Sequence, residues 1–167
     1  MGTTKTGRII NTRGAAGIAS QYSVIHSNEG AYTKPQKRQR VRLKSGGHGQ
    51  AGMNELDKYG IRYKVEKTYP NGVRVGHVFD HTNGNKRKSM GQSWFPKNWT
   101  SKDIKRAGEH VANLKKNRHV SDGKAVFGMW KGVRVGVIRT HGQIGTIFPD
   151  SKQFTKRKRG KNEYRKI

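Results

Sequence analysis

Two stretches of the chain alternate apolar and polar residues and are broken by glycine-containing turns, which favours antiparallel sheet. In the first, residues 61–95, the alternating runs are separated by "PNG" at 70–72 and "TNGN" at 82–85. Asn-Gly between alternating runs is the strongest short-range signal of a β-hairpin. Residues 61–95 are therefore predicted to form a three-stranded antiparallel meander.

The second stretch holds three further strand patterns: "AVFGMW" at 125–130, then "VRVGVIRT" and "IGTIF" after a turn at Lys131-Gly132. It also echoes the first stretch, because "GVRVGHVFDH" at 72–81 resembles "GVRVGVIRTH" at 132–141. The echo has two explanations. Either the fold has two similar sheet lobes, or hairpins with glycine turns converge on the same Val-Arg-Val alternation.

One segment between the two stretches has helical spacing. Thr100 or Ser101 can cap it, and Asp103 lies near the positive end of the helix dipole. Its apolar residues recur every three or four positions, at Ile104, Ala107, Val111 and Leu114. The pattern predicts a helix over 101–116.

Two shorter helices are predicted at 14–20 and 54–59, the second ended by Gly60. A few helices beside antiparallel strands indicate the α+β class. The length fits a single folded domain, placed at 13–150. We interpret residues 1–12 as a flexible linker and the basic segment 151–167 as a disordered tail.

The positive charge of the chain limits the choice of partner. There are 36 Lys and Arg against 10 Asp and Glu, a formal net charge of +26. Such a field favours a polyanion: nucleic acid first, an acidic protein second and an anionic membrane third. The segment "QKRQRVRLK" at 36–44 is so cationic that it is predicted to lie on the surface.

Composition also argues against several classes of protein. The chain has no cysteine, which excludes disulfides, thiolate metal sites and Cys-based zinc fingers. Because no apolar run approaches the roughly 18 residues that span a bilayer, membrane insertion is not expected. The small number of carboxylates argues against a two-metal nuclease.

Histidine is the residue type that can carry phosphodiester cleavage without a metal. A pair of imidazoles can supply a base and an acid near neutral pH, and a lysine can neutralise charge that develops on phosphate oxygens. Of the seven histidines, His48 stands out because Gly46, Gly47 and Gly49 flank it. These glycines are expected to let a ligand approach the backbone and to leave the ring accessible.

The other histidines are less distinctive. His26, in "YSVIHSNEG", is placed at the edge of a loop. His77 alternates with Val75 and Phe79 and is expected to pack on one face of a strand. The remaining four are expected on the surface: His81, His110, His119 and His141.

Four motifs follow one another along the chain: "GGH", "KRKSMGQSWFPKNW", "W-K-GVRV" and "GTIFP". In this order, with a helix between the second and third, they resemble the bacterial EndoU nuclease domain found at the C-termini of polymorphic and contact-dependent toxins. The resemblance covers roughly residues 24–150. It implies a two-lobed α+β fold of the barnase-EndoU-colicin-RelE type, with antiparallel sheets and a few packed helices.

The resemblance also implies a mechanism in which two histidines and a lysine form a 2′,3′-cyclic phosphate. His48 is the implied general base for the ribose 2′-hydroxyl, and His26 the implied general acid for the leaving 5′-oxygen. Lys88 is the implied lysine, with Lys86 as the alternative because this predicted hairpin can slip by two residues without changing face. No cofactor is expected.

Four residues are implied to contact the substrate: Gln92, Ser93, Thr146 and Phe148. Phe148 stands where many relatives of the family have tyrosine. A base can still stack on the phenylalanine ring, but the phenolic hydrogen bond is lost.

The leading hypothesis is a toxin endoribonuclease, with a metal-dependent DNase on the same fold and a non-catalytic nucleic-acid-binding module as alternatives. Only the DNase would need a divalent metal. Implied partners are nucleic acid (RNA, with tRNA among the candidates, or DNA) and a cognate immunity protein covering the cleft of His48 and Lys88. That protein is expected to be acidic, so its association rate should fall as salt rises. Such domains are delivered within a larger secreted toxin and act in the target-cell cytoplasm.

Overall fold

The alternating runs form antiparallel strands in the computed structural model, which describes residues 17–154. The first stretch folds into a sheet of order β3-β4-β5 and the second into a sheet of order β6-β7-β8, and both follow a small β1-β2 sheet. The strands are β1 (Ala31–Tyr32), β2 (Leu43–Ser45), β3 (Tyr63–Thr68), β4 (Arg74–Val78), β5 (Gln92–Trp94), β6 (Ala125–Trp130), β7 (Val133–Thr140) and β8 (Gln143–Pro149).

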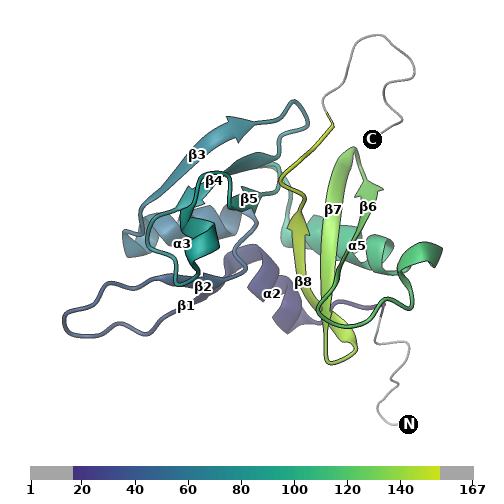
Figure 1. Cartoon of the computed structure of the whole chain (residues 1–167), viewed down its shortest axis with the longest axis horizontal. Coiled ribbons are helices and arrows are strands. Elements are labelled where there is room, and N and C mark those ends of the chain that lie inside the picture. Colours follow the sequence, from purple (N-terminus) through teal and green to yellow (C-terminus); the bar gives the residue numbers. More distant parts are fainter. Residues whose placement is uncertain (1–16, 155–167) are drawn as a thin grey trace.

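The two copies of the repeated motif each supply the middle strand of a sheet. β4 pairs with β3 and β5, and β7 pairs with β6 and β8. Figure 1 shows the two sheets in separate halves of the molecule. The repeated sequence motif therefore corresponds to two sheet lobes with the same strand order. The predicted α+β class is confirmed.

Helix α5 (Ser101–Ala112) begins as predicted but ends earlier. Thr100 and Asp103 form a capping box, in which each side chain bonds the other's main-chain N–H. At this end, the guanidinium of the buried Arg139 donates to the carbonyl oxygens of Ala112 and Asn117, both at 2.9 Å. After the helix, residues 115–117 form a 3-10 turn.

The prediction of a helix at 14–20 is wrong for residues 17–20, the part that the structure describes, because these residues are not helical. The helix there is α2 (Gln21–Glu29), and Ser20 is its N-cap, with a hydroxyl that accepts from the N–H of Ser23 at 3.1 Å. A capping serine has extended backbone, so it ends the preceding loop. The helix predicted at 54–59 is confirmed, but as the longer α3 (Gln50–Tyr59), which Gly60 ends in the left-handed region.

The Asn-Gly pair at 83–84 does not make the predicted hairpin turn. Asn83 instead caps the short helix α4 (Gly84–Arg87), because its side chain accepts from the N–H of Asn85 at 2.8 Å. The third strand of the meander shrinks to β5. Lys86 therefore lies within α4 and Lys88 at its C-cap, so the two lysines do not share the face of a strand.

The basic segment 36–44 lies on the surface, as predicted. Residues 36–42 belong to the long loop between β1 and β2, which Figure 1 shows projecting from one side of the molecule, and residues 43–44 begin β2. Leu43 is the exception, because it is fully buried and anchors the loop to the core. Among residues 17–154, no helix is long and apolar enough to cross a membrane.

The core has two parts. One, which includes Leu56, Val78 and Trp94, lies between α3 and the β3-β4-β5 sheet. The other lies between α5 and the β6-β7-β8 sheet and extends to Val75 and Phe95, so it joins the two halves. Helix α2 packs against β8, α3 and α5 and thus contacts both.

The C-terminal end of the described chain is packed onto β7. Gln153 is buried, and its side chain accepts from the N–H of Arg134 at 2.8 Å and donates to the carbonyl of the same residue at 2.9 Å. Ordered chain therefore extends into the first residues of the predicted tail. The predicted linker at 1–12 and the remainder of the tail, 155–167, lie outside the described residues.

Candidate active site

His26 and His48 are brought together by main-chain hydrogen bonds. The carbonyl groups at the end of a helix lack partners within the helix. In α2, the carbonyls of residues 26–28 accept from the N–H groups of residues 47–49, at 2.6 to 3.1 Å. The glycine-rich loop is thus built directly onto the last turn of the helix that carries His26. We call this set of three bonds the backbone clamp.

The glycines around His48 make room for α2 and not for a ligand. A Cβ atom on Gly46 would lie 2.2 Å from the carbonyl oxygen of His26, and Gly46 also has a φ of +70°. A Cβ atom on Gly49 would lie 1.8 Å from Oδ1 of Asn28. The prediction that the ring of His48 is accessible is wrong, because the residue is only 4% exposed.

The ring of His48 is held in one tautomer. Its Nδ1 lies 2.8 Å from the carbonyl oxygen of Ser93, and because a carbonyl can only accept, Nδ1 carries the proton. Nε2 then has a free lone pair, and it makes no hydrogen bond within residues 17–154. Burial lowers the pKa of His48 to about 3, and the positive charge of Lys86 acts in the same direction. His48 is therefore neutral at pH 7 and able to accept a proton.

His26 was predicted at the edge of a loop, but it lies within helix α2. It is half-buried, and this burial lowers its pKa below the usual 6.5. His26 lies close enough to His48 for a charge on one ring to lower the pKa of the other.

Lys86, the alternative lysine, is the one that the structure places beside the histidines. It is half-buried, which lowers its pKa, and its ammonium in turn lowers the pKa values of His48 and His81. Lys88 is exposed at the end of α4.

His81 was predicted on the surface, and this is wrong. It is 2% exposed, and its Nδ1 accepts from the N–H of Asn83 at 2.9 Å. Burial lowers its pKa to about 4, and the charges of Lys86 and Arg87 contribute. The sequence pattern missed His81 because it lies beyond the end of β4, where alternation no longer applies. No spacing in the sequence signals this burial.

Strand β8 brings Thr146 and Phe148 to the same site. The two residues alternate along the strand, so their side chains lie on one face, and both are half-buried. The ring centroid of Phe148 lies 5.9 Å from that of His48. Ser27, on α2, fixes β8 in place, because its buried hydroxyl accepts from the N–H of Ile147 at 2.9 Å.

Gln92 and Ser93 have side chains that hold the backbone of the site. Both are buried on β5. Gln92 donates to the carbonyl oxygen of Gly46 at 3.3 Å, and the hydroxyl of Ser93 donates to that of Pro149 at 2.7 Å. The second bond ties the two sheets together next to His48. Both residues therefore position other groups and do not face open space.

The family model described as "Bacterial EndoU nuclease" matches residues 20–151, which include every residue of this site. The chain belongs to the bacterial EndoU nuclease family. No curated protein and no solved structure gives a significant match. The resemblance drawn from the four motifs is thus confirmed, and nucleic acid is the substrate class that the family implies.

The site of this EndoU domain combines three chemical capacities. His48 offers a neutral imidazole with one free nitrogen, Lys86 offers a half-buried positive charge, and His26 offers a second imidazole. A buried cation acts on a phosphate more strongly than an exposed one, because less water screens it. Together these groups can accept a proton, stabilise an anion and donate a proton.

Proposed function

We propose that this EndoU domain is a toxin endoribonuclease that leaves a 2′,3′-cyclic phosphate and needs no metal. The observation that supports this proposal is the fixed, neutral tautomer of His48, whose free nitrogen lies near Lys86 and His26. A general base must be unprotonated and must have its lone pair available. The Nδ1 bond to Ser93 leaves the lone pair of Nε2 available, and burial keeps the ring unprotonated at pH 7.

In the proposed reaction, Nε2 of His48 takes the proton of the ribose 2′-hydroxyl, and the 2′-oxygen attacks the adjacent phosphorus. The ammonium of Lys86 stabilises the negative charge that grows on the phosphate oxygens. The bond between phosphorus and the 5′-oxygen breaks, and His26 donates a proton to that oxygen. The products are a 2′,3′-cyclic phosphate and a 5′-hydroxyl, and one proton has passed from substrate to enzyme and one back.

Phe148 faces the nucleoside whose 2′-hydroxyl is attacked, because its ring lies beside that of His48. The ring of Phe148 provides a surface for base stacking, and it has no hydrogen-bonding group with which to select a base. The net charge of +26 supports binding of RNA through its phosphates, with tRNA among the candidates. The same charge supports an acidic immunity protein as partner. Delivery within a larger toxin is proposed from the family resemblance alone.

Matched oligonucleotides test this function. RNA should be cut in the presence of EDTA and should carry a 2′,3′-cyclic phosphate at the new end. DNA and an oligonucleotide with a single 2′-deoxy residue at the cleavage position should resist, because the nucleophile is missing. Mass spectrometry of the products decides the outcome. Strict dependence on magnesium or manganese, or efficient cutting of DNA, would contradict the proposal.

The pH dependence of kcat/KM tests the assignment of acid and base in the free enzyme. His48 must be neutral, which holds above its pKa of about 3. His26 must be protonated, and this form is lost as the pH rises through a pKa that burial holds below 6.5. The optimum is therefore expected on the acid side of pH 6.5, with kcat/KM falling about tenfold per pH unit well above the pKa of His26.

Initial rates on a ribodinucleotide between pH 4 and 8 measure this profile. His110→Ala, which removes an exposed histidine on α5, is the control and should leave the profile unchanged. A value of kcat/KM that rises between pH 6.5 and 8 would contradict the role of His26 as the acid.

A further inference from the structure

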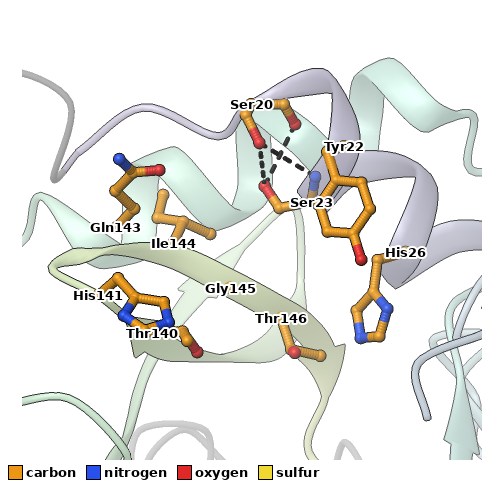
Figure 2. A pocket seen from close by; sticks show the side chains of 10 residues that line it. All are labelled: Ser20, Tyr22, Ser23, His26, Thr140, His141, Gln143, Ile144, Gly145 and Thr146. Carbon is orange, nitrogen blue, oxygen red and sulfur yellow. Dashed lines mark hydrogen bonds between the residues drawn. The ribbon is translucent and has the colours of Figure 1, made fainter. Parts of the chain in front are cut away.

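A cavity of about 460 Å³ opens between α2 and β8, and His26 is part of its lining. His26 and Thr146 form one end of its lining, and neither His48, Phe148 nor Lys86 takes part. Figure 2 shows Thr146 beside His26, and Thr140, His141 and Gln143 toward the opposite end. The cavity is thus continuous with the proposed proton donor and separate from the proposed base.

The rim of this cavity carries an aromatic side chain that no packing explains. Tyr22 is 78% exposed, one helical turn before His26 on α2. Its ring is nearly parallel to that of His26, at an angle of 18° and a centroid separation of 6.4 Å (Figure 2). Exposed aromatic rings are surfaces on which nucleic-acid bases stack, whatever their sequence.

The direction of the proposed reaction decides which nucleoside can occupy the cavity. His26 donates to the 5′-oxygen that leaves, and that oxygen belongs to the nucleoside on the 3′ side of the cleaved phosphate. The nucleoside on the 5′ side must instead place its 2′-hydroxyl at His48 and its base near Phe148. The cavity begins at His26 and excludes both of those residues.

We propose that this cavity is the subsite for the leaving nucleoside, with Tyr22 as its stacking platform. Its volume lies in the range of cavities that hold small ligands. The lining adds hydroxyl groups from Ser20, Ser23 and Thr140 and an amide from Gln143. The proposal rests on the function proposed above and adds a second binding position to it.

Two substrates that are cleaved by the same reaction distinguish stacking of Tyr22 on the leaving nucleoside from any other role of Tyr22. A ribodinucleotide and the matching ribonucleoside 3′-(methyl phosphate) are both cleaved by attack of the 2′-hydroxyl, and both leave an alkoxide that His26 must protonate. Only the dinucleotide carries a leaving nucleoside. The wild type should prefer the dinucleotide, and Tyr22→Ala should lower the ratio of the two kcat/KM values about tenfold, a loss typical of one stacked base.

The control variants define the outcomes. Tyr22→Phe should restore most of the preference, and Tyr59→Ala, which removes an exposed tyrosine on α3, should leave the ratio unchanged. If Tyr22→Ala lowers both rates equally or neither, the cavity is not the subsite. Failure of the proposed function would be seen separately, as a His26→Ala variant that cleaves both substrates at the wild-type rate or as products without a cyclic phosphate.

Discussion

Replacement of His48 by asparagine is expected to lower RNA cleavage at least ~100-fold, the usual contribution of a general base, with the fold intact. The amide of asparagine can take the place of Nδ1 and donate to the carbonyl of Ser93, but it offers no base. The measurement is kcat/KM on a ribodinucleotide, with circular dichroism to verify folding. His48→Ala should lose as much activity, and it also removes the bond to Ser93.

The matched control for this substitution is His110→Asn, on the exposed face of α5. It makes the same chemical change outside the site and should retain full activity. A folded His48→Asn variant that cleaves at the wild-type rate would remove His48 from the reaction. Loss of folding in His48→Ala beside a folded but inactive His48→Asn variant would show that the bond to Ser93 also supports the fold.

The second large effect is expected from Lys86. Lys86→Ala should reduce kcat about 100-fold, because it removes a half-buried cation that stabilises the charge on the phosphate. Lys88→Ala changes the net charge by the same amount, two residues away, and should reduce kcat less than about twofold because the side chain is exposed.

This pair of variants separates the local role of the cation from the general attraction of RNA to a basic protein. A higher KM with an unchanged kcat in both variants would indicate that the lysines act only through general attraction. An inactive Lys88→Ala variant beside an active Lys86→Ala variant would show that Lys88, the lysine implied by the family resemblance, is the one that acts in catalysis. Lys86→Ala should also raise the pKa of His48, because the charge of Lys86 now lowers it, and an NMR titration of the imidazole detects this shift.

Local signals predicted most of the regular structure. The capping box of α5, the glycine that ends α3 and the alternation of β7 each depend on residues close together in the chain, so the sequence pattern is sufficient. The prediction at Asn83 failed because asparagine before glycine suits two structures, a hairpin turn and a helix cap. The side chain of Asn83 bonds the N–H of Asn85, and the cap forms.

The errors in the candidate site have a different physical cause. Glycines beside His48 permit a close approach, but the sequence does not say whether a ligand or a helix makes it. Here α2 does, with a carbonyl where the Cβ of Gly46 would lie. The burial of His81 and of Lys86 depends on how distant segments pack, and no spacing within residues 81–88 encodes that.

The backbone clamp between residues 26–28 and 47–49 has a consequence for how such a site can change over time. The two histidines are held by bonds that every amino acid except proline can make, so the clamp depends little on neighbouring side chains. Mutations can accumulate at exposed positions of α2 outside the site, such as Ile25, without moving the rings. Selection then acts on the reactive side chains and on positions such as Gly46 where any Cβ would collide. Descendants of one ancestor can in this way drift far apart in sequence and still cut with the same geometry.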